Sequence, residues 1–422
     1  MKAFHHRDFL IFWIGAVISN TGTWILNLTL PFVLFELTGS ALWVGAAVAA
    51  QFLPMFVFSP LGGSVADQFP RRSVLLVMQI AMGLGAGLIW LAWVSDVRSP
   101  SVLLLLVALV GAMNGISMPS WQGFVHDLVP RQDLLSAVTL NSLQFNAARA
   151  IGPAIGGVLL ATLGPSWAFG LNALSYAFIV TSLVLIRSGR GQHRKRSELK
   201  FVQQIRSAIS YIGTQPGIMM AFLVAFTVGF LGNPVFSFTV VFAGSVFDVG
   251  PLQLGLMNAA LGVGAFAAAP LVGGSRFAPK LSVVAGGGLV LYGVMLMVFA
   301  LSPNYFVGVA ALIVIGACFL SVVASINTAG QMIVADDYRG RVLALRMMVF
   351  TVAAPTGGLV QGWLADVIGP RFTVAGAGVV MVVVALLLIV KRGSVRLARL
   401  DDPHDAARDP SLAEQRASIV RE

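Results

Sequence analysis

Residues 74–94 read Val74-Leu-Leu-Val-Met-Gln-Ile-Ala-Met-Gly-Leu-Gly-Ala-Gly-Leu-Ile-Trp-Leu-Ala-Trp-Val94, twenty-one consecutive residues without a charged side chain. A helix that crosses the hydrocarbon core of a bilayer needs about 20 predominantly apolar residues. The 422 residues are 57% hydrophobic and only 10% charged, and soluble domains carry about 25% charged residues. With a mean hydropathy of +0.88, this composition excludes a water-soluble enzyme, a secreted disulfide scaffold and a disordered chain.

The chain contains twelve such segments, and their unbroken apolar runs exclude an outer-membrane barrel, whose strands alternate in polarity over about ten residues. The first segment exceeds the ~7–15 residue core of a signal peptide, so we interpret it as a retained span. The sequence therefore predicts an all-α polytopic membrane protein with twelve transmembrane helices, over residues 9–35, 41–66, 74–94, 101–126, 137–163, 167–186, 217–243, 251–273, 281–301, 305–333, 342–368 and 372–390.

The basic residues predict the orientation of these spans. If the N-terminus is placed inside, 24 of the 27 Lys and Arg residues lie on inner segments, including three in residues 335–346. Such a bias is typical of cytoplasmic loops. We therefore expect both termini in the cytoplasm, and the protein in the inner or plasma membrane. The net charge of +10 is explained by this bias, so membrane lipids and a small-molecule substrate are the expected partners of a monomer, with no nucleic acid.

The longest inner loop separates two halves that repeat. We predict a six-helix bundle over residues 1–186, a linker over 187–216, a second bundle over 217–390 and a disordered cytoplasmic tail over 391–422. The linker either contains a short amphipathic helix on the membrane face or is a plain solvated segment. Parallel six-span repeats place a substrate site near the midplane of transporters. At an offset of 205 residues, the halves pair Gly111 with Gly316, Gly152 with Gly357, Gly157 with Gly362, and Gly164-Pro165 with Gly369-Pro370.

The loop after the second span reads Gly63-Ser-Val-Ala-Asp67-Gln-Phe-Pro-Arg71-Arg72. An Asp at a helix end beside two Arg residues can hold neighbouring helices together through charge pairs. The spacing and position resemble the loop that follows the second of twelve spans in the major facilitator superfamily, although Gln68 and Pro70 depart from it. The resemblance implies the major facilitator fold and a conformational latch formed by Asp67, Arg71 and Arg72.

The fifth span contains Arg149-Ala-Ile-Gly152-Pro153-Ala-Ile-Gly156-Gly157. Small residues four apart let helix backbones approach closely, and a proline allows a bend. The stretch resembles the span-5 motif of drug antiporters in that superfamily and implies a gating role for Gly152, Pro153, Gly156 and Gly157. Together with Phe9-x-x-Phe12-Trp, Leu128-Val-Pro-Arg131 and Phe145-Asn-Ala-Ala-Arg149, it resembles the branch of macrolide-efflux and enterobactin-exporter proteins. The fourth span lacks the Arg motif of many proton-coupled exporters.

Polar side chains within spans are costly, so each needs an internal partner or a water-lined cavity. Two interpretations stay open for them, a substrate cavity or hydrogen bonds between helices. Arg149 most needs such a partner or cavity, because no carboxylate lies at a comparable depth in the predicted membrane spans. The cavity candidates are Asn20, Trp24, Asn27, Asn114, Asn141, Gln144, Arg149, Asn233, Asn258, Asn327 and Gln331.

The motifs for other functions are missing. The five His residues and Cys318 show no metal-ligand spacing, and no phosphate-binding loop is present, so we expect neither an enzyme, a metal, a cofactor nor direct ATP drive. Candidates for coupling to a proton gradient are Asp67, His126, Asp127 and Glu36. The favoured hypothesis is a secondary active exporter of amphipathic molecules such as drugs or siderophore-like compounds, acting as a proton antiporter by alternating access. The alternatives are an importer or lipid flippase of the same fold, and a membrane sensor that transports nothing.

Overall fold

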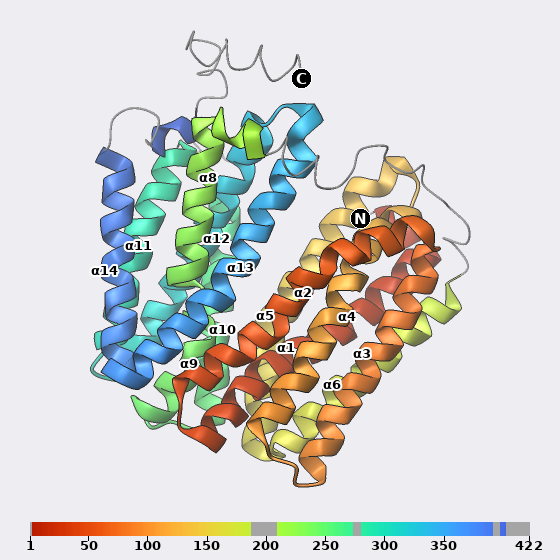
Figure 1. Ribbon diagram of the computed structural model, residues 1–422, viewed down its shortest axis with the longest axis horizontal. Coiled ribbons are helices and arrows are strands. Elements are labelled where there is room, and N and C mark those ends of the chain that lie inside the picture. Colours follow the sequence, from red (N-terminus) through yellow and green to blue (C-terminus); the bar gives the residue numbers. More distant parts are fainter. Residues whose placement is uncertain (1, 187–208, 273–279, 391–396, 402–422) are drawn as a thin grey trace. The chain divides into compact units, whose positions relative to one another are not determined.

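The computed structural model describes residues 2–186, 209–272, 280–390 and 397–401, and its regular structure in these ranges is helical throughout (Figure 1). Helices α8 and α9 with the π-helix η3 form one interrupted span, so the predicted twelve spans are present. The long helices are α1 (Arg7–Thr38), α2 (Ala41–Gln68), α3 (Arg71–Val94), α4 (Pro100–Asp127), α5 (Leu134–Thr162), α6 (Pro165–Leu185), α8 (Pro216–Thr227), η3 (Val228–Gly232), α9 (Val235–Ser245), α10 (Pro251–Val272), α11 (Leu281–Leu301), α12 (Tyr305–Ile333), α13 (Asp336–Ile368) and α14 (Pro370–Val390).

Within the described ranges, 11 helices are long and apolar enough to cross a membrane. Helix α5, with 29 residues, is long enough but falls outside this set. It is the helix that carries Asn141, Gln144, Asn146 and Arg149. Large apolar side chains also point outward from other helices, among them Leu84 with 67% and Phe306 with 79% of its surface exposed. Such apolar outer faces are typical of a protein surrounded by lipid.

The chain divides into two compact units whose composition differs from the predicted bundles. Unit 1 contains Met1–Arg196 together with Phe236–Ala259 and Gly358–Val367, and unit 2 contains the remainder. The difference arises because α9, the part of α10 up to Ala259 and the last part of α13 pack against helices of the first half. Chain order alone therefore does not define the units.

A short helix follows the last span. Leu397–Asp401 form the 3-10 helix η4, in which Leu397 and Leu400 are buried and Asp401 accepts a hydrogen bond from the backbone N–H of Ser282. The prediction of a disordered tail is therefore wrong for these five residues, because two leucines anchor them to unit 2. The predicted amphipathic helix of the linker lies outside the described residues except for its end, where residues 209–213 are helical.

Matching turns support the internal repeat. Gly164 precedes α6 with φ of 80°, and Gly369 precedes α14 with φ of 90°. Positive φ favours glycine, and in both places a proline occupies the first helical position, where its missing N–H costs nothing. The two Gly-Pro pairs predicted to correspond thus form the same turn at the start of the last span of each half.

The paired glycines also make corresponding helix contacts. A Cβ atom on Gly111 of α4 would lie 2.3 Å from the carbonyl oxygen of Gln51 in α2, and one on Gly316 of α12 would lie 2.0 Å from that of Leu261 in α10. In both halves the fourth span therefore crosses the second at backbone contact. Only glycine allows this distance, so the repeat read from the sequence is a repeat of helix crossings.

Span 7 is interrupted near its middle. The N–H of Asn233 donates to the carbonyl oxygen of Val228 at 2.7 Å, a π-type bond that lengthens the turn. Pro234 follows and has no N–H to continue the helical ladder. Single π turns in helices are frequent at functional sites, and this one places the candidate residue Asn233 at the break.

The carboxylate of Asp366 caps a helix of another span. Helix α2 begins after Ser40, whose side chain does not cap its own helix. Instead, Asp366 near the end of α13 accepts the N–H of Ala41 at 2.6 Å, the N–H of Leu42 at 3.2 Å and the hydroxyl of Ser40. A carboxylate at a helix N-terminus satisfies otherwise unpaired donors and interacts favourably with the helix dipole. Asp366 therefore ties Gly358–Val367 to the first half of the chain within unit 1.

We expect Asp366→Ala to lower the thermal midpoint of the purified protein, because removing a helix cap costs about 0.5–2 kcal/mol. Asp366→Asn keeps one acceptor but loses the charge, so its midpoint should lie between those of Asp366→Ala and the unmodified protein. Asp67→Ala is the matched control, since Asp67 is exposed and has no hydrogen bond or ion pair within the described ranges. Equal midpoints for Asp366→Ala and Asp67→Ala would contradict the cap.

Candidate substrate site

A chain of amide side chains links α1 to α5 inside unit 1. The Nδ2 of Asn20 donates to the Oε1 of Gln144 at 3.0 Å, and the Nε2 of Gln144 reaches the Oδ1 of Asn141 at 3.4 Å. Gln144 is buried, with 1% of its surface exposed. The structure thus brings together three candidates, although Asn20 and Gln144 are 124 residues apart in the sequence. Each amide still has unused hydrogen-bonding capacity.

Beside this chain, Arg149 lies among aromatic rings. Its guanidinium carbon lies 5.5 Å from the ring centroid of Trp24 and 4.8 Å from that of Phe236. Trp24 in turn meets Phe145 edge to face at 5.9 Å. Arg149 is fifteen residues after the start of α5 and thirteen before its end, about 22 Å and 20 Å along the axis. A half-buried cation at mid-helix with flat apolar walls fits a bulky amphipathic ligand.

Three other candidates make contacts that hold helices together, and a fourth, Gln331, is exposed. The Nε2 of Gln51 donates to the Oδ1 of Asn27 at 2.7 Å and joins α1 to α2. Asn258 donates to the Oγ1 of Thr239 at 2.9 Å and to the carbonyl of Leu254 at 3.2 Å. Asn114 contacts the sulfur of Met55. For Asn27 and Asn258 these bonds favour the interpretation that the amides connect helices.

In unit 2, Asn327 has a partner that the sequence analysis missed. Its Oδ1 accepts a hydrogen bond from the Nη2 of Arg346. Arg346 was counted among the basic residues of the inner segment 335–346, but α13 begins at Asp336, so Arg346 lies ten residues inside the helix. The offset of 205 residues could have found it, because Arg346 corresponds to Asn141 of the amide chain.

The glycines of the span-5 motif are points of close helix contact. A Cβ on Gly152 would lie 2.5 Å from the Cβ of Trp24, and one on Gly157 would lie 2.6 Å from the Cα of Gly255 in α10. Gly156 faces Leu28 more loosely at 3.2 Å, and Pro153 is buried beside these glycines. The motif thus sets α5 tightly against α1 and α10 in unit 1, next to Arg149.

The loop residues predicted as a latch use a different acid from the one expected. Arg71 donates to both carboxylate oxygens of Asp127, at 2.9 and 3.0 Å, and to the carbonyl of Gly123. Arg72 donates to the carbonyls of Leu183 and Val184 at the end of α6. Asp67 is exposed and has no hydrogen bond or ion pair within the described ranges. In this conformation the three helix ends are therefore held by Arg71, Arg72 and Asp127, while His126 and Glu36 are exposed.

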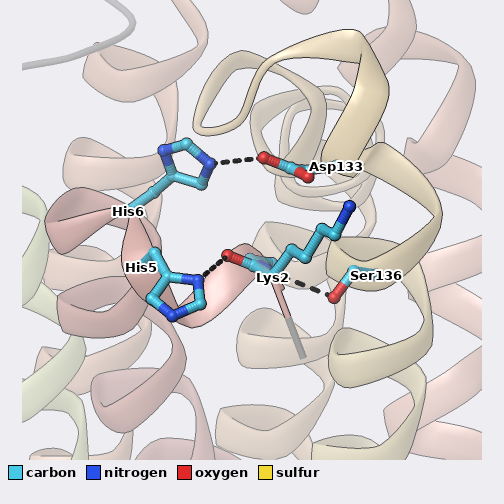
Figure 2. Close-up of polar contacts among 6 residues, drawn as sticks. Lys2, His5, His6, Asp133 and Ser136 are labelled. Carbon is cyan, nitrogen blue, oxygen red and sulfur yellow. Dashed lines mark hydrogen bonds and ion pairs between the residues drawn. The ribbon is translucent and has the colours of Figure 1, made fainter.

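A second tie, at the start of α5, involves the N-terminal segment. The 3-10 helix η1 (Lys2–His5) folds against the start of α5, where the Nε2 of His6 lies 2.8 Å from the Oδ2 of Asp133 (Figure 2). The N–H of Ala3 donates to the hydroxyl of Ser136 at 3.3 Å. This contact was not predicted, because His6 and Asp133 are 127 residues apart and neither belongs to a motif.

We expect Asp127→Asn to lower the thermal midpoint clearly more than Asp67→Asn, because only Asp127 neutralises a half-buried Arg71. Hydrogen bonds between charged partners contribute about 1.5–3 kcal/mol, and an exposed Asp without a partner contributes little. Thermal unfolding of the two variants in detergent measures the difference. If transport falls in Asp67→Asn while its stability is unchanged, Asp67 acts in another conformation, and equal midpoints would contradict the role of Asp127.

With this geometry in view, comparisons with known proteins identify the family. The family described as transmembrane secretion effector, of the major facilitator type, matches residues 1–418. The chain belongs to this family. Relatives include the enterobactin exporter EntS of Citrobacter koseri, 25% identical over 94% of this chain and 95% of that protein, and macrolide efflux protein A of Streptococcus pyogenes, 20% identical over 90% and 94%.

A solved structure supports the same fold. The crystal structure of a bacterial homolog of the human lysosomal transporter Spinster matches with a TM-score of 0.72 at 14% identity, covering 95% of this chain and 98% of that one. The protein is thus a multi-pass membrane transporter of the major facilitator superfamily and not an enzyme, as the motifs of the loop and the fifth span predicted.

Proposed function

We propose that this transmembrane secretion effector exports amphipathic organic molecules that carry aromatic or carbonyl-rich groups, by alternating access. The observation that carries the proposal is the cluster of Trp24, Phe145, Arg149 and Phe236 beside the Asn20–Gln144–Asn141 chain. Rings supply apolar area and amides supply orientation, which is the usual make-up of small-molecule sites. Relatives named for the export of enterobactin and the efflux of macrolides support the direction and the substrate class.

We further propose that the proton gradient supplies the energy and that no bound cofactor is needed. Two carboxylates hold helix ends in this conformation, Asp127 through Arg71 and Asp366 through the N-terminus of α2. Protonation would remove the charge that maintains each contact. Of the earlier candidates for coupling, Asp127 is supported best, and Asp366 joins it, while Asp67, His126 and Glu36 stay predictions.

Transport in proteoliposomes with an imposed pH gradient tests this function. We expect amphipathic aromatic dyes to move only when a gradient is present. Arg149→Gln should reduce movement of an anionic dye while sparing a matched neutral one, because it removes the cation but keeps a polar side chain. Arg149→Lys should be intermediate, since lysine keeps the charge and loses the planar guanidinium. An equal loss for both dyes, after normalisation to folded protein, would assign Arg149 to packing.

Other outcomes of this assay distinguish the alternatives. Movement without a pH gradient would overturn proton coupling, and net uptake against the expected direction would favour an importer. Movement of labelled lipid would favour a flippase. If no member of a broad compound panel moves in protein with an unchanged thermal midpoint, the sensor interpretation replaces export.

We also propose the orientation given by the basic residues, with both termini in the cytoplasm. Cysteine labelling in cells tests it in a Cys318→Ser background, which removes the native thiol. A cysteine at Gly213, which is exposed before α8, should react only after the membrane is opened, and one at Ser99, which is exposed before α4, should react in intact cells. The reverse pattern would overturn the orientation.

A further inference from the structure

Arg346 is a buried cation whose hydrogen-bonding capacity is largely unused. Only 5% of its surface is exposed, and it ranks among the few charged residues buried in the described ranges. Its Nη2 donates to Asn327, while its Nε is buried and has no hydrogen-bond partner in the described part of the chain. A guanidinium has five N–H donors in a rigid plane. Most of them are therefore available to a group that is not part of the protein.

Among the described residues, no acid pairs with Arg346. The sequence has no Asp or Glu in residues 281–335, which covers α11 and α12, and none in residues 338–365 of α13. Taking a cation out of water without a counter-charge is costly. Ionisable groups kept inside spans despite this cost are usually functional.

Arg346 lies well inside α13, one turn after a residue of an apolar cluster. It lies about 15 Å from the start of α13 and about 33 Å from its end at 1.5 Å per residue. One turn before it, Val342 belongs to an apolar cluster with Ile212, Ile218 and Val334. Residues four apart lie on the same helix face, so Arg346 lies one turn from this cluster on the face that carries Val342.

We infer that Arg346 and Asn327 form an anion-binding site in unit 2 that receives a planar carboxylate-type group of the transported molecule. A carboxylate would accept two parallel N–H bonds from the guanidinium, the geometry that makes such pairs strong and specific. The Nδ2 of Asn327 supplies a further donor. This inference rests on the proposed transport function and adds a preference for organic anions over neutral molecules of the same shape.

Binding of a matched ligand pair tests the site. The probes are 1-naphthoate, which is an anion, and 1-naphthamide, which has nearly the same shape without charge. We expect the purified full-length protein to bind naphthoate more tightly than naphthamide by calorimetric titration. Arg346→Gln should weaken naphthoate binding by about ten- to a hundredfold, the effect of losing a charged hydrogen bond, and leave naphthamide nearly unchanged.

Three further variants separate binding from folding. Arg346→Lys keeps the charge and should retain part of the preference. Asn327→Ala should keep the preference for the anion, because Arg346 remains, whereas a purely structural pair would make Asn327→Ala and Arg346→Gln equally unstable. Arg371→Gln is the control for net charge, since Arg371 donates to the carbonyls of Ala300 and Ser302 near the start of α14. It should leave the preference unchanged.

Retention of the full preference in Arg346→Gln would overturn the inference, as would an equal loss of both ligands or the absence of a preference in the unmodified protein. Efflux of a neutral dye by Arg346→Gln distinguishes this failure from failure of the proposed function. If the neutral dye still moves and naphthoate binding is unchanged, transport stands and the anion site does not.

Discussion

The structure depends on one constraint, that a polar group inside an apolar span must find its partner within the protein. Water is not available there, and an unpaired donor or acceptor is costly. The described spans meet this constraint in several ways. Thr and Ser hydroxyls donate to carbonyls one turn earlier in their own helix, as Thr29 does to Ile25. Amides reach across to another helix, as Gln51 does to Asn27.

The same constraint separates structural from functional groups. Asn258 is satisfied by Thr239 and by its own helix, and nothing about it requires a ligand. Arg149 has two aromatic faces near its charge, which lower the cost of burial and leave a surface for a flat ligand. Within the described ranges, Arg346 has a single amide partner and no acidic one. The less a buried polar group is satisfied by the protein, the more strongly it points to a substrate.

Much of the fold could be predicted, because a membrane span requires an apolar segment of about 20 residues that is visible in the sequence. The twelve spans follow from apolar runs, and the paired glycines at an offset of 205 residues mark equivalent helix crossings. The units could not be predicted, because the assignment of Phe236–Ala259 and Gly358–Val367 to unit 1 depends on packing between distant segments. Helix starts were also misjudged where charged residues continue a helix, and this error placed Arg346 among the basic residues of an inner segment.

The residues of the candidate site could be predicted from their type and position, but their hydrogen-bond and ion-pair partners could be predicted less well. Asn20, Gln144 and Asn141 were singled out as polar side chains within predicted spans, and the structure connects them. Asp67 was singled out from a motif, yet it is Asp127 that neutralises Arg71. A residue of a sequence motif can act in any conformation of a transport cycle, whereas one structure shows the contacts of one conformation. We propose that Asp67 acts in another conformation, since its carboxylate is exposed and has no hydrogen bond or ion pair within the described ranges, whereas Asp127 holds Arg71 here.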